Sequence, residues 1–153
     1  MFNFFRKKAV HPFSQEEQQL VVAAIQAAEH QTSGEVRVYI ESKCRFMDAL
    51  DRAHEVFGEL KMYATEQRNG VLIYVALKDK QLAVYGDEGI HQKVGDAFWN
   101  EAVKNMLAHF NKENYAQGIA SMVAEVGEAL KQHFPYDAAT DKNELPDDIV
   151  FGR

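Results

Sequence analysis

Acidic and amide side chains are the residues of this sequence whose types and spacing could do chemistry. Asp87 and Glu88 are adjacent within a short glycine-flanked segment, and Glu35 and Asn69 stand at the starts of two apolar segments. All four side chains offer oxygen ligands, which suit Ca²⁺ or Mg²⁺ better than zinc or copper. Carboxylates gathered in one place repel one another, and a divalent cation would relieve that repulsion. The four residues therefore make a candidate divalent-metal site, provided that the fold brings them together.

A structural role is the alternative for each of these residues. Asp87 is well placed to cap a following helix, where a carboxylate also answers the helix dipole. Glu35 could be an exposed strand residue that pairs with Arg37 or Arg68. The neighbouring glycines could serve only the turns. The sequence leaves both interpretations open.

Other chemistry has weaker support. The sequence contains no P-loop, no dinucleotide-binding glycine motif, no G-x-S-x-G elbow and no HExxH motif. Cys44 and Arg45 lack the spacing of the Cys-x5-Arg phosphate loop, so Cys44 is interpreted as a passive small side chain. The remaining candidates are scattered histidines, which are not expected to form a metal cluster: His54, His91, His109 and His133. No catalytic nucleophile can be placed.

Two strands joined by a tight turn have to position the acidic pair. Residues 71–77 form a continuous apolar run rich in β-branched residues, which is typical of a strand buried on both faces. Residues 82–85 predict a second strand. The connection between them is so short that the strands must be antiparallel. The start of the first strand, at Asn69, and the end of the second, at Asp87, therefore lie at the same edge of the sheet.

A strand–helix–strand unit brings Glu35 to that edge. Residues 35–41 alternate between polar and apolar, which predicts a strand with one polar face or one near the edge of the sheet. A helix over about residues 47–62 connects this strand to residues 71–77, so the two strands are expected to be parallel. Parallel strands start at the same edge, which places Glu35 near Asn69. Three further polar residues are expected there: Thr32, Ser33 and Arg68.

Three more helices are predicted around the sheet. The first begins at a capping box formed by Ser14 and Glu17 and ends near Gln31. The second begins near the acidic pair and runs to about Phe110. The third starts near Asn114. Their apolar residues recur at helical spacing, so each helix is expected to bury one face against the sheet or a neighbouring helix.

Length and composition indicate one domain. The 153 residues are 46% hydrophobic and 26% charged, which is ordinary for a globular chain large enough to bury a core. Residues 13–135 are expected to form the domain, and residues 136–153 an extended and partly ordered C-terminal tail. The net charge of −6 argues against a general nucleic-acid binder. The partner is unknown, and a protein partner is compatible with these features.

The sequence predicts a cytoplasmic protein without stable membrane association. The single cysteine, Cys44, cannot form an internal disulfide, which is compatible with a reducing compartment. No apolar run of signal-peptide or transmembrane length follows the N-terminal residues 1–10. The aromatic and basic residues of that segment leave a weak membrane-surface anchor as the alternative.

Several segments together resemble the TPM-domain family, which includes thylakoid acid-phosphatase-type proteins, photosystem II repair proteins and many bacterial proteins. The resemblance extends from about residue 13 to residue 148, and the order and spacing of the segments make it specific. The segments are TSGEVRVYIE (32–41), RNGVLIYVA (68–76), GDEGI (86–90), FW (98–99), HFP (133–135) and NELPD (143–147). The resemblance implies a three-layer α/β/α sandwich, Rossmann-like, with a small mixed β-sheet.

The resemblance also implies a function. Members of the family are expected to bind divalent metals, Ca²⁺ most often, through acidic loops at one end of the sheet, and plant members are credited with acid phosphatase activity. The family's acidic loop falls on Asp87 and Glu88, and its TSGE segment on residues 32–35. Many relatives carry a signal peptide and a transmembrane or glycine-rich segment that this sequence lacks, so it resembles the short soluble bacterial members.

Two functions are therefore expected. The first is a divalent-metal (Ca²⁺ or Mg²⁺) binding module, with Glu35, Asn69, Asp87 and Glu88 as the site residues. The alternative is a metal-assisted acid phosphatase acting on phosphomonoesters. In that case Arg68 would hold the phosphate, and Glu88 or Glu35 would act as the general base.

Overall fold

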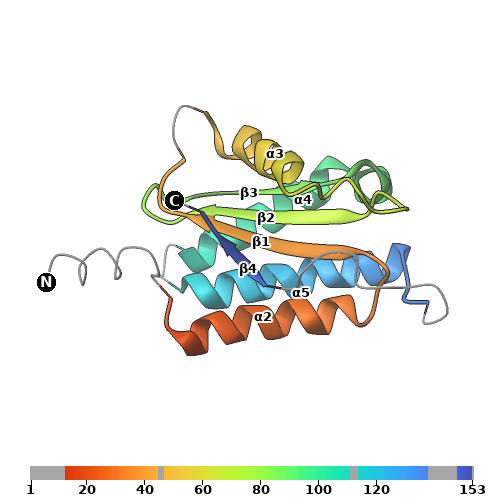
Figure 1. Cartoon of the computed structure of the whole chain (residues 1–153), viewed down its shortest axis with the longest axis horizontal. Helices are drawn as coiled ribbons and strands as arrows, with labels where there is room; N and C mark the ends of the chain where they lie inside the picture. The colour runs from red at the N-terminus through yellow and green to blue at the C-terminus, as the bar shows by residue number, and fades with distance from the viewer. Residues whose placement is uncertain (1–12, 45–46, 111–113, 138–147, 153) are drawn as a thin grey trace, which may run out of the picture.

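A mixed β-sheet lies between two layers of helices in the computed structural model (Figure 1). The structure describes residues 13–44, 47–110, 114–137 and 148–152. Within these ranges, one helix covers one face of the sheet and three helices cover the other. The predicted α/β fold is therefore confirmed, with helices on both faces.

The sheet has four strands in the order β3-β2-β1-β4. Strand β1 (Glu35–Glu41) is parallel to β2 (Gly70–Ala76), and β2 is antiparallel to β3 (Gln81–Gly86), as the connections predicted. Strand β4 (Ile149–Phe151) is parallel to β1. The starts of β1 and β2 and the end of β3 therefore share one edge, which we call the amino edge; it lies at the right in Figure 1. The opposite edge, where β1 and β2 end, is the carboxyl edge.

Strand β4 lies within the predicted extended C-terminal tail, and the sequence did not predict its pairing with the sheet. It has only three residues and pairs with Val38 to Ile40 of β1, more than 100 residues earlier in the chain. Its pairing places β1 inside the sheet. Glu35, Arg37 and Glu41 of β1 are buried, so the interpretation of Glu35 as an exposed strand residue is wrong.

The layer on one sheet face consists of α2 (Gln15–Glu29), α4 (Glu88–Phe110) and α5 (Tyr115–His133). In Figure 1, α2 and α5 lie below the sheet and α4 runs behind it. Helix α2 begins with the predicted capping box at Ser14. Helix α4 is broken at Gly95, which adopts φ 76° and ψ 175°, and the sequence did not predict this break. The three helices cover the main core, which they share with the side chains of one sheet face: Val36, Val38, Ile40, Val71, Ile73, Val75, Leu82 and Val84.

The upper layer is α3 (Ala49–Glu59), which is shorter than the predicted helix over residues 47–62. The side chain of Asp48 caps it by accepting the N–H of Asp51 at 2.8 Å. Helix α3 packs Val56 and Phe57 against the second sheet face in a smaller core. No helix in the described ranges combines the length and the apolar character needed to cross a membrane.

Candidate functional site

Backbone hydrogen bonds bring the predicted site residues to the amino edge. The N–H of Glu35 donates to the carbonyl of Asn69 at 3.3 Å. The N–H of Asp87 donates to the carbonyl of Gly70 at 2.9 Å, which ties the end of β3 to the start of β2. Glu88 follows as the first residue of α4. The segments thus lie where the strand directions predicted, while their role as metal ligands stays a prediction.

Asp87 is held by a two-pronged ion pair with Arg68. The Arg68 Nε donates to Oδ2 of Asp87 at 2.7 Å, and Nη2 donates to Oδ1 at 2.9 Å. Oδ1 also accepts the N–H of Glu88 at 2.8 Å, so Asp87 satisfies the first amide of α4, as the structural alternative predicted. The Asp87 side chain is 4% exposed, whereas that of Arg68 is 43% exposed. A buried carboxylate is therefore neutralised from the solvent side.

Glu88 faces the same guanidinium. Its Oε1 lies 2.9 Å from Nη1 of Arg68, and its side chain is largely exposed. The hydrogen bond that Arg68 donates to Asp87, helped by the charges of Asp87 and Glu88, raises the pKa of Arg68, so the guanidinium stays cationic. One positive group thus bridges two carboxylates, and this small cluster carries a net charge of −1.

Asn69 is buried at the same edge, with 1% of its surface exposed. Its Nδ2 donates to Oγ of Ser33 at 3.3 Å, and its backbone N–H donates to Oγ1 of Thr65 at 3.2 Å. Its Oδ1 has no hydrogen-bond donor among the described residues, although it is buried. A buried acceptor without a donor is costly, by about 1–3 kcal/mol, so this oxygen is available to a cation.

The other residues expected at the edge have different neighbours. The hydroxyl of Thr32 donates to the carbonyl of Phe134, which joins the entry of β1 to the end of α5. Glu35 lies near Arg37 and affects its pKa. Burial lowers the pKa of Arg37, and the negative charges of Glu29, Asp148 and Glu35 oppose that shift. Glu35 therefore belongs to a buried charge arrangement along β1, beside the cluster at Asp87.

The oxygen atoms of these side chains are suitable ligands for a hard cation such as Ca²⁺. In this structure, however, the carboxylates already bind a cationic group. Both oxygens of Asp87 and one oxygen of Glu88 contact the guanidinium of Arg68. Within the described ranges, no three His, Cys, Asp or Glu side chains converge as a metal-binding group. An ion would reach Asp87 only if the guanidinium moved away.

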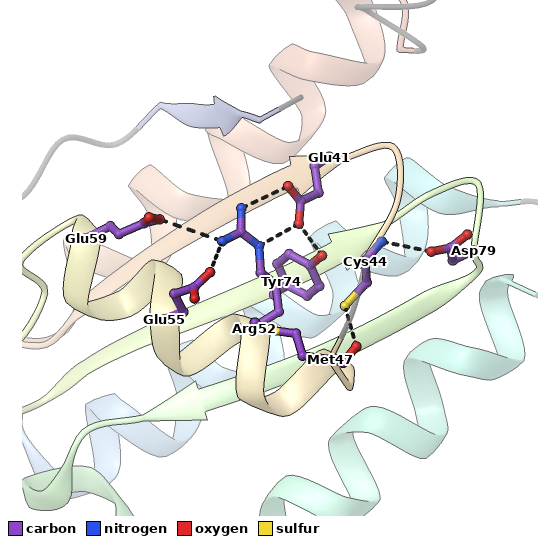
Figure 2. A network of polar contacts seen from close by, with 8 residues as sticks. All are labelled: Glu41, Cys44, Met47, Arg52, Glu55, Glu59, Tyr74 and Asp79. Atoms are coloured by element: carbon purple, nitrogen blue, oxygen red, sulfur yellow. Dashed lines mark hydrogen bonds and ion pairs between the residues drawn. The ribbon is translucent and has the colours of Figure 1, made fainter.

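A second polar cluster, which the sequence did not predict, lies at the carboxyl edge. Figure 2 shows Arg52 of α3 reaching Glu41 at the end of β1. Arg52 Nε and Nη2 contact the two Glu41 carboxylate oxygens at 2.9 and 3.0 Å, and the hydroxyl of Tyr74 donates to the same carboxylate. Arg52 also pairs with Glu55. The signal in the sequence was the acidic residue at the end of a strand whose apolar residues are β-branched, but its partner on α3 could be found only from the fold.

The electrostatics of this second cluster favour a structural role. Burial raises the pKa of Tyr74, and its hydrogen bond to Glu41 adds to the shift. The same carboxylate raises the pKa of Arg52. Nearby, the N–H of Cys44 donates to Asp79 at 2.8 Å, which ties the loop after β1 to the β2–β3 turn. The cluster keeps Tyr74 neutral and the ion pair intact, and it fastens α3 and two loops to the sheet.

An open groove of about 780 Å³ lies between α4 and α5. Its apolar lining comes from Val94, Phe98 and Ala129, next to the break at Gly95. Its remaining lining residues are polar or charged, with both signs present: Lys93, Glu125, Glu128, Lys131, Gln132 and His133. The sequence did not predict this groove, and its mixed charges select no particular ligand.

Comparison with known proteins identifies the family. The family model described as "TPM domain" matches residues 8–129. The BA42 protein from the psychrophilic bacterium Bizionia argentinensis is 41% identical, with a TM-score of 0.84 over 92% of this chain and 95% of that one.

Two solved structures below 25% identity share the fold. The N-terminal domain of a P. gingivalis protein is 17% identical, with a TM-score of 0.64 over 82% of each chain. The N-terminal domain of cg2496 from Corynebacterium glutamicum is 16% identical, with a TM-score of 0.59 over 77% of this chain and 74% of that one. No curated protein matches the sequence. On the strength of the family model and the BA42 likeness, the chain belongs to the TPM-domain family.

Proposed function

We propose that this TPM-domain protein is a divalent-cation binding module whose site is the amino edge of the sheet. The observation that carries the proposal is the buried carboxylate of Asp87, which needs a positive charge and receives it from a half-exposed arginine. The buried Oδ1 of Asn69, which lacks a donor among the described residues, adds a neutral oxygen at the same edge. Ca²⁺ and Mg²⁺ are the cations that prefer such oxygen donors.

Asp87, Glu88 and Asn69 are the proposed ligands, and Glu35 adds negative charge from the neighbouring strand. Asp87 is anchored by the N–H of Glu88, while Glu88 itself is exposed and can adjust its position. Ca²⁺ takes six to eight oxygens in flexible geometry, so water would supply the rest of its shell. Mg²⁺ demands a stricter octahedral shell. We therefore expect Ca²⁺ to bind more tightly than Mg²⁺.

Calorimetric titration of chelator-treated protein with CaCl₂ and MgCl₂ tests this function. Asp87→Asn keeps the size of the side chain and its capping oxygen but removes the charge, and it should weaken Ca²⁺ binding about tenfold or more, which is at least about 1.4 kcal/mol. Asp96→Asn is the matched control, because Asp96 lies on the same helix with its side chain 89% exposed. Equal affinities for wild type and Asp87→Asn, or no binding at millimolar metal, would contradict the proposal.

A metal-assisted phosphatase acting on phosphomonoesters is the alternative function. It needs a bound cation and, in addition, a cationic group that holds the phosphate, and Arg68 could do so only after its fork has left Asp87. We therefore place it second. Metal-dependent hydrolysis of p-nitrophenyl phosphate that Asp87→Asn abolishes and Asp96→Asn retains would favour it. Hydrolysis that survives Asp87→Asn would indicate a contaminating enzyme.

A further inference from the structure

We infer that Arg68 is a built-in competitor of the metal: its guanidinium occupies the carboxylates of the amino edge and must leave when a divalent cation binds. The inference rests on the proposed function and adds to it a control on affinity. The affinity for the ion would then depend on the strength of the ion pairs that Arg68 makes with Asp87 and Glu88.

The contacts of Arg68 are those that a cation would need. Its nitrogens lie 2.7 and 2.9 Å from the two oxygens of Asp87 and 2.9 Å from an oxygen of Glu88. A divalent ion bound to the same oxygens would lie within a few ångströms of the guanidinium, and two positive charges at that distance repel strongly. Binding of the ion and retention of the ion pair therefore exclude each other.

The side chain of Arg68 can leave without unfolding the loop that carries it. The backbone of Arg68 is fixed independently, since its N–H donates to the carbonyl of Thr65 at 3.2 Å and its carbonyl accepts the N–H of Gly89 at 2.8 Å. The side chain is already 43% exposed, so its charge can move into water at little cost. Asp87, which is 4% exposed, has no such freedom.

The backbone around Arg68 holds it next to the acidic pair. Arg68 adopts φ 52°, a left-handed conformation that is strained for a residue other than glycine. Gly89 permits the close approach, because a Cβ there would lie 2.6 Å from the carbonyl oxygen of Arg68 and 2.1 Å from that of Gln67. Arg68 thus occupies a position where glycine would be less strained, and from there its side chain contacts Asp87.

Titration of Ca²⁺ into Arg68→Gln tests the inference. If the ion pair is formed about nine-tenths of the time, its removal should tighten Ca²⁺ binding about tenfold, since the apparent affinity scales with the fraction of molecules that are competent to bind. Lys61→Gln is the matched control: Lys61 is also exposed and left-handed, at φ 56°, and the substitution removes the same charge. Its affinity should stay within about twofold of wild type.

A second measurement uses the wild-type protein. The Nε–H resonance of Arg68, shifted by its bond to Asp87, should move toward the position of solvent-exposed arginines as Ca²⁺ is added. An Nε–H resonance that stays in place while the site saturates would overturn the inference, even if Arg68→Gln failed to fold.

The outcomes separate the inference from the proposed function. Tighter Ca²⁺ binding by Arg68→Gln, with the affinity of Lys61→Gln unchanged, supports both the inference and the proposed function. Equal or weaker binding by Arg68→Gln, with wild type binding normally, overturns the competition but leaves the cation site standing. No binding by wild type or Arg68→Gln overturns the proposed function and the inference together.

Discussion

Asp87 performs two tasks that can be separated by substitution. One is capping, since its Oδ1 accepts the N–H of Glu88 at the start of α4. The other is electrostatic, since both carboxylate oxygens meet the fork of Arg68. The sequence predicted the first task from position alone and the second only as a possible metal ligand. The choice of Arg68 as the charge partner depends on a left-handed backbone and on the close approach of Gly89, and neither can be read from periodicity.

The capping task gives a prediction at the residue scale. Asp87→Ala should lower the free energy of unfolding by about 1 kcal/mol relative to Asp87→Asn, because asparagine keeps the capping oxygen and alanine does not. Urea unfolding without metal, followed by circular dichroism, measures the difference. If the two variants unfold at the same urea concentration, the bond from Glu88 to Asp87 does not stabilise α4.

At the scale of elements, α3 is fastened to the sheet by one buried carboxylate. Glu41 accepts hydrogen bonds from Arg52 on α3 and from Tyr74 on β2, as Figure 2 shows. The alternation in residues 35–41 correctly predicted β1 but suggested that its polar face meets solvent. Glu35, Arg37 and Glu41 of that face are buried instead, and the residue that covers Glu41 is Arg52, which lies outside the strand.

The raised pKa of Tyr74 predicts a loss of stability in alkali. The unfolded tyrosine releases its proton near pH 10, before the folded one does, so the stabilisation is complete below about pH 10 and declines as the pH rises above it. Tyr74→Phe should cost about 1 kcal/mol at pH 8 through loss of a hydrogen bond.

Above pH 10 the variant should lose stability less steeply than wild type. Some decline should remain, because burial also raises the pKa values of Tyr39 and Tyr85. Urea unfolding between pH 8 and pH 11 checks this, and equal slopes for the two proteins would mean that Tyr74 does not titrate with unfolding.

Secondary structure could be predicted where the signal is local. The capping box at Ser14 marked the start of α2, and the short turn after β2 fixed the antiparallel pairing of β3. The break at Gly95 was missed, because a single glycine inside a helical pattern is normally tolerated. Strand β4 was missed because three residues carry no period and the pairing partner is distant in the chain.

At the scale of the whole molecule, the two edges of the sheet differ. Open α/β sheets usually bind ligands outside the carboxyl ends of their strands, but here that edge carries the buried Glu41 cluster. The amino edge carries Asp87 and Glu88 with a half-exposed counter-ion and a buried Asn69 oxygen. The strand directions predicted that these residues would meet, which is the part of the site that topology decides. We therefore expect ligand binding at the amino edge.

The most direct test is an NMR titration of chelator-stripped protein with Ca²⁺ and Mg²⁺, following the backbone amides of the whole chain. We expect saturable shifts concentrated at the amino edge, in Glu35, Asn69, Gly86, Asp87 and Glu88, with the amides around Glu41 and Tyr74 unmoved. Shifts that are absent at millimolar metal, or that are spread over the acidic surface without saturation, would contradict it. In that case Asp87 and Arg68 would be capping and charge-pairing residues alone.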